Sequence, residues 1–286
     1  MAQSRVTRVP RDLAQFSSPL LQDMLYGRRM IQDTNEPLSP QELERYSRHI
    51  VLAEIGGAGQ QRLKRARVLV VGAGGLGAPV LSYLAAAGVG TLGIVDDDVV
   101  SLSNLQRQII HDTASINQPK VESASSTITR INPHVHVNTH HLRLDADNAP
   151  ALVAAYDLVI DGSDNLAARY VMADACAAEM RPLVAAAVSR FDGWLTVLKP
   201  YESNAEGRKN PSLRDLFPHE PPPGMTPSCA EAGIVGALTG IIGSMQAMEA
   251  IKLIVGAGEP LIGRLFLYDG LGGRTEIIRY HAGPAL

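Results

Sequence analysis

Cysteine and charged side chains are scarce in this sequence. Only two of its 286 residues are cysteine, Cys176 and Cys229, too few for a disulfide framework or an all-cysteine zinc site. We therefore expect a reducing, cytoplasmic location. Charged residues make up 19% of the chain and leave a net charge of −3. This near balance argues against nucleic acid and anionic membrane surfaces as partners.

The first 37 residues are polar, and they contain no apolar segment of the kind that forms a secretory signal. We interpret residues 1–37 as a polar N-terminal extension. Residues 38–286 suffice for one large α/β domain at roughly 150 residues per domain. Intrinsic disorder is excluded by composition, because 45% of the chain is hydrophobic.

Two uncharged runs match membrane spans in length alone. The first, residues 68–95, exceeds the roughly 18 residues of a transmembrane candidate, but glycines divide it into pieces of different period. It predicts a strand at 68–71, a glycine-rich turn, a helix at 78–87 and a strand at 91–95. The second run, residues 232–248, contains polar side chains and predicts part of a core helix from Ala230 to Val255.

Strands and helices alternate along the rest of the chain. Ser39 and Glu42 form a capping box that predicts a helix from Pro40 to Leu52. The proline-rich segment 201–227 is predicted to be a crossover loop. The alternation predicts the α/β class, with a doubly wound, mostly parallel, Rossmann-like sheet that has helices on both faces. Helices are predicted at 120–131 and 165–179, and strands at 135–139, 157–161, 183–188, 195–199, 264–269 and 275–280.

A glycine-rich loop is the first feature that indicates chemistry. Gly72, Gly74 and Gly77 satisfy G-x-G-x-x-G directly after a predicted strand, where the amides of a helix N-terminus approach a phosphate. Asp96 ends the next strand and is placed to accept hydrogen bonds from ribose hydroxyls. The pattern predicts a nucleotide site but does not distinguish NAD from ATP. The sequence contains no P-loop motif, so ATP use of the P-loop kind is excluded.

Cationic and amide side chains follow this loop in the sequence. Arg107, Gln108 and Lys120 are of the types that neutralise a transferring phosphate, which hydride transfer does not require. Asp164 follows a predicted strand at its carboxyl end, where ligands of α/β sheets bind. Its carboxylate is suited to Mg²⁺ or to capping the helix that follows.

Seven segments of the chain carry a family resemblance: Arg45–Ile50, Gly72–Gly77, Ser101–Gln108, Gln118–Lys120, Asp161–Asn165, Cys229–Gly233 and Gln246–Lys252. In this order they resemble the bacterial relatives of ubiquitin-activating enzymes, the adenylyltransferases of molybdopterin-synthase and thiamine sulfur carriers. The resemblance covers residues 38–286. It implies a homodimer that binds MgATP and adenylates the C-terminal glycine of a ubiquitin-like sulfur-carrier protein.

The resemblance also implies roles for single residues. Asp164 would bind Mg²⁺, and Arg48 would reach the site of the partner subunit. Arg48, Arg107 and Lys120 would neutralise charge during the reaction. Cys229 matches a cysteine that some relatives link covalently to their carrier. The implied nucleotide-binding residues are Gly75, Asp96, Asn104, Arg107, Gln108 and Lys120.

The few cysteines separate variants within this family. Ser212 and Asp215 stand where zinc-binding members have cysteines, and no cysteine pair occurs near Leu286. We therefore expect no zinc, and a crossover loop that is more mobile than in zinc-bearing relatives. Ser228 begins a capping-box pattern that places Cys229 in a first helical turn, where the dipole favours a thiolate. An inert small residue at Cys229 is the alternative.

Several alternatives stay open at this point. An NAD-dependent dehydrogenase or a non-catalytic binding module would also fit the nucleotide loop. The carrier is of the molybdopterin or the thiamine type, and the segments 229–233 and 246–252 favour the former. Because no rhodanese-like segment follows the motifs, we expect a separate sulfur donor. A histidine group lacks ligand spacing and is interpreted as a solvated strand face; it comprises His134, His136, His140 and His141.

Overall fold

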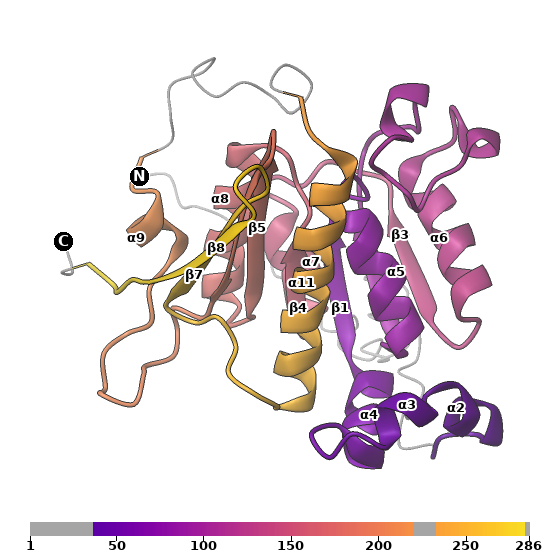
Figure 1. Ribbon diagram of the computed structural model, residues 1–286, viewed down its shortest axis with the longest axis horizontal. Helices are drawn as coiled ribbons and strands as arrows, with labels where there is room; N and C mark the ends of the chain where they lie inside the picture. The colour runs from indigo at the N-terminus through magenta and orange to yellow at the C-terminus, as the bar shows by residue number, and fades with distance from the viewer. Residues whose placement is uncertain (1–36, 220–232, 284–286) are drawn as a thin grey trace, which may run out of the picture. The chain divides into compact units, whose positions relative to one another are not determined.

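One mixed sheet organises the computed structural model, which describes residues 37–219 and 233–283 (Figure 1). Within these residues, eight strands lie in the order β3-β2-β1-β4-β5-β6-β7-β8. The first five in this order pair in parallel, and the last three extend the sheet by antiparallel pairing. The strands are β1 (Arg67–Val71), β2 (Thr91–Val95), β3 (His136–His140), β4 (Leu158–Asp161), β5 (Leu183–Ser189), β6 (Asp192–Leu198), β7 (Arg264–Asp269) and β8 (Arg274–Arg279).

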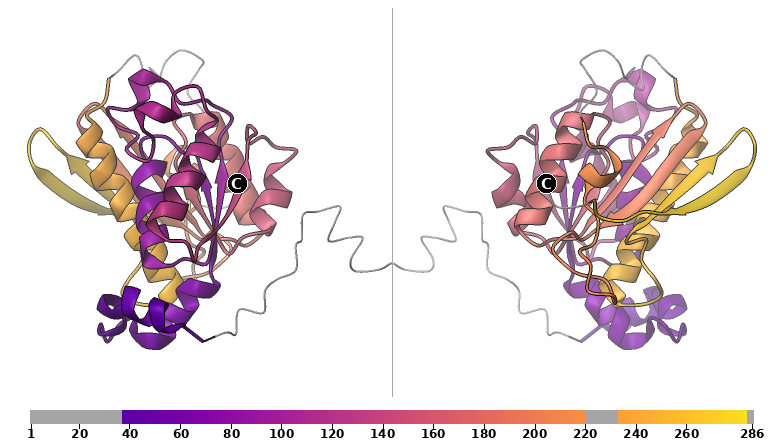
Figure 2. Two further views of the ribbon diagram at one scale, coloured as in Figure 1. Left: turned by 90° about the vertical axis from the view of Figure 1, so that its right-hand side faces the viewer. Right: turned by 90° about the vertical axis from the view of Figure 1, so that its left-hand side faces the viewer.

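Helices cover both faces of the parallel half (Figures 1 and 2). Helices α5 (Gly77–Ala87), α6 (Lys120–Ile131) and α11 (Gly236–Val255) lie on one face, and α7 (Ala149–Ala154) and α8 (Leu166–Ala178) lie on the other. Along β1, Val68 and Val70 pack into one apolar cluster and Leu69 and Val71 into the second. Strands buried on both faces need such continuous apolar runs. The predicted doubly wound fold is confirmed.

The first predicted helix is interrupted. The capping box of Ser39 and Glu42 is present at α2 (Pro40–Arg45), but a second short helix, α3 (Ser47–Ile50), follows. Tyr46 separates them because its buried ring packs against Gly88 and its hydroxyl accepts a hydrogen bond from Asn132 at 2.8 Å. The sequence analysis also missed α4 (Gly56–Arg65), which begins with two glycines.

The long C-terminal helix begins later than predicted. Val235 is the N-cap of α11, and Ile234 instead forms a parallel bridge with Arg190. Cys229, with the capping box expected around it, lies outside the described residues. By length and hydropathy α11 could cross a membrane, but it contacts α5, β5 and β6 and half of its apolar window is buried. These contacts are those of a core helix, as predicted.

The described part of the crossover loop, residues 201–219, is held by hydrogen bonds. It contains α9 (Leu213–Leu216), where the Asp215 carboxylate accepts from the backbone N–H and hydroxyl of Ser212, both at 2.7 Å. The same carboxylate accepts from Gly283 N–H at 2.6 Å. Tyr170 of α8 donates its hydroxyl to the Phe217 carbonyl at 2.6 Å. Residues 220–227 lie outside the description, and the mobility of the loop stays a prediction.

Gly77 offers a test of the fold at the nucleotide loop. A Cβ at Gly77 would lie 1.9 Å from the Gly72 carbonyl oxygen, whereas a Cβ at Gly240 of α11 would meet nothing within 4 Å. We expect Gly77→Ala to lower the free energy of unfolding by about 1–3 kcal/mol. The matched control Gly240→Ala should raise it by up to about 1 kcal/mol. Denaturant unfolding measures both, and equal effects would contradict the predicted close contact.

Candidate functional site

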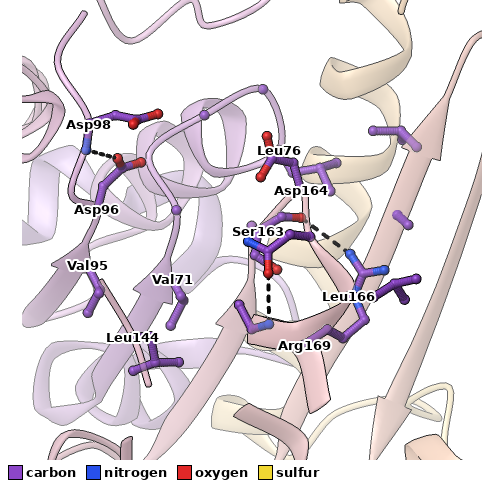
Figure 3. A pocket seen from close by; sticks show the side chains of 18 of the residues that line it. Val71, Leu76, Val95, Asp96, Asp98, Leu144, Ser163, Asp164, Leu166 and Arg169 are labelled. Carbon is purple, nitrogen blue, oxygen red and sulfur yellow. Dashed lines mark hydrogen bonds between the residues drawn. The ribbon is translucent and has the colours of Figure 1, made fainter. Parts of the chain in front are cut away.

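A cavity of about 900 Å³ opens at the carboxyl ends of β1, β2 and β4 (Figure 3). Because β1 lies between β2 and β4, the order of the strands reverses there, and ligands of open α/β sheets bind at such a point. The glycine loop follows β1, Asp96 follows β2, and the turn Gly162–Asn165 follows β4. Three segments that are distant in sequence thus line one cavity.

The glycine loop is held through the backbone of Ala73. Its N–H donates to Asp96 Oδ2 at 2.8 Å, and its carbonyl accepts from His111 Nε2 at 2.9 Å. The other nitrogen of the buried His111 ring, Nδ1, lies 2.8 Å from Ser123 Oγ. Burial lowers the pKa of His111, which favours a neutral ring that donates from Nε2 to Ala73 and accepts from the Ser123 hydroxyl at Nδ1. His111 was not predicted as a site residue, because a single histidine in a loop forms no recognisable pattern.

Asp96 and Lys120 belong to one polar group beside this loop. Asp96 Oδ1 accepts a hydrogen bond from Asp98 N–H at 2.9 Å. With the bond from Ala73 N–H to Oδ2, each carboxylate oxygen of Asp96 therefore accepts one backbone hydrogen bond. Burial raises the pKa of Asp96, and the Lys120 charge opposes that shift. The Lys120 side chain is 7% exposed and donates Nζ to Asp98 Oδ2 at 2.7 Å. A desolvated ammonium at the rim of the cavity is suited to an anionic ligand.

Asp164 and Gln108 present oxygens without partners. In the described residues, the Asp164 carboxylate lines the cavity and no hydrogen bond or ion pair involves it. It does not cap α8, because Asn165 Oδ1 accepts from Ala168 N–H at 2.8 Å. Gln108 is 4% exposed, and its Oε1 has no hydrogen-bond partner in the described part of the chain. A hard cation such as Mg²⁺ prefers oxygen ligands of this kind, so these residues fit one.

The other residues expected at the site divide into two groups. Gly75 and Arg107 line the cavity, and a Cβ at Gly75 would lie 2.9 Å from Thr239 Cγ2 of α11. Asn104 is not among the lining residues; its Oδ1 accepts from Ser101 N–H at 3.1 Å. Arg48 is exposed on α3, beside α4 and thus near the amino end of β1, away from the cavity (Figure 1). Its predicted role therefore requires another copy of the chain.

A buried ion pair beneath the cavity was not predicted. Arg169 Nε donates to Asp161 Oδ2 at 2.5 Å, and the two side chains are 6% and 0% exposed. The Arg169 guanidinium lies over the Trp194 ring, which packs on Phe217. The position of Asp161 at the end of a buried strand was a signal, but the partner eight residues later was not recognisable.

The histidine group does not converge on a ligand. His134, His136 and His141 are exposed, as expected of a solvated strand face. His140 departs from that prediction: its ring is half-buried and lies 3.0 Å from the buried Tyr156 hydroxyl. Among the described residues, the cluster of possible metal-binding side chains is Asp96, Asp97 and Asp98 rather than any histidine.

Comparison with known families agrees with this arrangement. The model of the ThiF family matches residues 46–284. The chain belongs to the ThiF family. The match spans the glycine loop, the polar groups around the cavity and the antiparallel extension of the sheet.

Curated relatives are about 50% identical to this ThiF-family chain over the aligned residues. The probable adenylyltransferase/sulfurtransferase MoeZ of Mycobacterium tuberculosis is 52% identical over 248 residues, 87% of this chain and 62% of MoeZ. The sulfur carrier protein adenylyltransferase of Thermus thermophilus is 47% identical over 244 residues, 85% of this chain and 89% of that protein. The chain therefore spans less than two thirds of MoeZ but most of the Thermus relative.

Solved structures support the fold. A crystal structure of E. coli MccB with MccA-N7isoASN superposes with a TM-score of 0.73 at 18% identity, covering 97% of this chain and 81% of MccB. Selenomethionine PaaA gives a TM-score of 0.71 at 22% identity, covering 95% and 85%. At these identities the likeness concerns the fold alone.

The neutral His111 predicts a pH dependence of stability. Its pKa is lowered in the folded chain, so the unfolded chain binds more protons just below the ordinary value of about 6.5. The free energy of unfolding should therefore fall as the pH drops below about 6.5. Burial lowers the pKa of His140 in the same direction. We expect His111→Gln to reduce this slope between about pH 7 and 5.

Urea unfolding over a pH series measures the slope. The exposed His136 of β3 provides the control, and His136→Gln should leave the slope as it is in the wild-type protein. A slope that His111→Gln leaves unchanged would contradict the neutral, loop-bonded ring.

Proposed function

We propose that this chain adenylates the C-terminal carboxylate of a ubiquitin-like sulfur-carrier protein, using ATP. One observation carries the proposal: Arg107 and Lys120 line the same cavity as the glycine loop and the unpaired Asp164. Relatives named sulfur carrier protein adenylyltransferase and SAMP-activating enzyme E1 support the reaction. Hydride transfer needs no such convergence of cations, which disfavours a dehydrogenase. The retained polar groups disfavour a module without catalysis.

The reaction places two anions in contact. A terminal carboxylate with a pKa near about 3.5 is ionised at neutral pH, so no general base is needed. Its oxygen attacks the α-phosphorus, a carboxyl-phosphate bond forms, and the bond to the bridging oxygen of pyrophosphate breaks. The electron pair of that bond leaves with pyrophosphate. Arg107 and Lys120 would supply counter-charge, and the glycine loop would fix the phosphates in line.

Mg²⁺ is the proposed cation of this site. Asp164 is the proposed ligand, and the orphaned Oε1 of Gln108 would accept from a bound water or the nucleotide. When bound, the cation would neutralise charge on the departing pyrophosphate. Asp96 would accept from the ribose, because each carboxylate oxygen has a further lone pair beyond its bond to backbone. Gly75, which lines the cavity, keeps its predicted place beside the nucleotide. Asn104 does not line the cavity, and its contact with the nucleotide stays a prediction.

We further propose a homodimer in which Arg48 acts in the cavity of the partner subunit. Within its own chain, Arg48 lies at the opposite end of β1 from the cavity. Exposed apolar side chains support an interface on the sheet face that α5 and α11 cover: Ile241 and Met248 share a face of α11, and Tyr83 lies on the adjacent α5. A surface of this kind is typical of an interaction site.

The carrier and the later steps are proposals as well. We favour the carrier of molybdopterin synthase over the thiamine carrier, on the segments 229–233 and 246–252. Cys229 is the proposed thiol for a covalent link to the carrier. The sulfur donor would be a separate protein, and the cytoplasm is the proposed location.

Arg107→Ala tests the adenylation step. We expect it to reduce ATP–pyrophosphate exchange by at least about 100-fold, because a counter-charge at the transferring phosphate is lost. The exposed Arg130 of α6 gives the control variant Arg130→Ala. Full exchange activity in Arg107→Ala would refute the assignment.

A separate experiment identifies the carrier. The wild-type protein is incubated with each carrier and labelled ATP, and the mass of the AMP adduct is measured.

Mixing two inactive variants tests the shared site. If Arg48 acts across the dimer, a mixed dimer of Arg48→Ala and Asp164→Asn contains one site with both lesions and one intact site. Random reassortment then restores about one quarter of wild-type activity. If Arg48 acts within its own chain, every site keeps one lesion and the mixture stays inactive, which contradicts the proposal.

A further inference from the structure

The Asp161–Arg169 pair lies next to the cavity, and stability does not account for it. Both side chains are almost fully buried, at 0% and 6% exposed. Taking two charges out of water costs free energy that their attraction often fails to recover, so apolar residues would serve stability as well. A buried pair of this kind is best attested where it fixes a particular geometry.

The hydrogen bonds of the pair converge on one residue. Asp161 Oδ1 accepts from the backbone N–H of Ser163 at 2.9 Å and from its hydroxyl at 2.6 Å. Arg169 Nη2 donates to the Ser163 carbonyl at 3.3 Å. Both backbone polar groups of Ser163 are thus bonded to the pair. Ser163 directly precedes Asp164, and Figure 3 shows Arg169 beneath this turn and Asp164 above it.

The guanidinium is itself fixed to the sheet. Its Nη2 also donates to the Ala186 carbonyl of β5 at 3.0 Å. Its Cζ lies over the ring of Trp194 in β6, 5.2 Å from the ring centroid. Trp194 packs in turn on Phe217, with 5.3 Å between centroids. Arg169 therefore connects the turn after β4 to two neighbouring strands and to the crossover loop.

Asp164 has no bond of its own that would fix its place. In the described residues its carboxylate has neither a donor nor a cation beside it. The backbone of the turn consequently sets where this carboxylate stands, and a displacement of about 1 Å in such a group can cost about 100-fold in rate.

We propose that Arg169 is the positioning residue of this turn. Its side chain is among those that line the cavity, but it acts by fixing the place of Asp164 through Ser163 rather than by binding the nucleotide. This inference depends on the proposed function, in which Asp164 acts in adenylation. The role requires several N–H donors in the fixed planar arrangement of a guanidinium, which lysine does not have. A positive charge alone at position 169 would not perform this role.

Arg169→Lys is the first test, because it keeps the charge and loses the fork. We expect kcat for adenylate formation to fall by about 10- to 100-fold, and KM for ATP to change by less than about threefold. Amide hydrogen exchange of the full chain should rise at Ser163, whose N–H bond depends on the pair. Trp194 is the sole tryptophan, so its emission should shift when the guanidinium is withdrawn from its ring.

Two further variants separate positioning from stability. Ser163→Ala removes the hydroxyl bond and leaves the pair intact. We expect a smaller fall in kcat, about two- to tenfold, and a melting temperature lowered by only about 2–4 °C. The control Arg214→Lys alters an arginine of α9 that pairs with Asp174 of α8, the helix that also contains Arg169. Both side chains of this control pair are at least half exposed. It should leave kcat, Ser163 exchange and Trp194 emission unchanged.

The outcomes are distinguishable. The inference would be overturned by wild-type kcat in both Arg169→Lys and Ser163→Ala, together with wild-type amide exchange at Ser163 in Arg169→Lys. A loss of activity in Arg169→Lys that Arg214→Lys reproduces would do the same, since the effect would then be general destabilisation. A wild-type protein that binds ATP but forms no adenylate with either carrier would overturn the proposed function instead, whatever the exchange at Ser163 shows.

Discussion

The site depends on a backbone contact between two turns. A Cβ at Gly72 would lie 2.5 Å from the Gly162 carbonyl oxygen, and a Cβ at Gly162 would lie 2.8 Å from the Gly72 carbonyl oxygen. Gly72 also has a φ of +97°, which L side chains rarely adopt. The loop after β1 and the turn after β4 can meet only because neither position carries a side chain. This contact places the predicted phosphate-binding loop beside Asp164.

The polar groups around the cavity divide by their partners. His111, Asp161 and Arg169 are buried, and their polar atoms form hydrogen bonds that hold backbone groups in place. Asp164 and Gln108 instead keep oxygens without partners in the described residues. Buried or confined polar atoms cost free energy unless a ligand satisfies them. The bonded groups therefore hold the geometry, and the unbonded ones are the candidates for contact with nucleotide and cation.

Much of the parallel half of the fold was predictable, because local pattern and tertiary role agree there. The predicted strand at 91–95 and helix at 120–131 have the bounds that the structure shows. Prediction failed where a distant contact decides the local structure. Tyr46 divides one amphipathic segment into two helices because Asn132 donates a hydrogen bond to its hydroxyl and Gly88 packs against its ring. The start of α11 is delayed because Ile234 pairs with Arg190 of the β5–β6 turn.

The sequence by itself determined the βαβ start, the doubly wound class and the candidates Asp96, Arg107, Gln108, Lys120 and Asp164, because residue type and short-range spacing encode these features. Gly75 became a candidate only through the family resemblance. The tertiary structure decided which side chains share the cavity, and it separated Arg48 and Asn104 from its walls. It also showed the supports at His111 and Arg169, whose partners come from other loops and strands. Burial and pairing are long-range properties, so no local pattern of residues could have determined them.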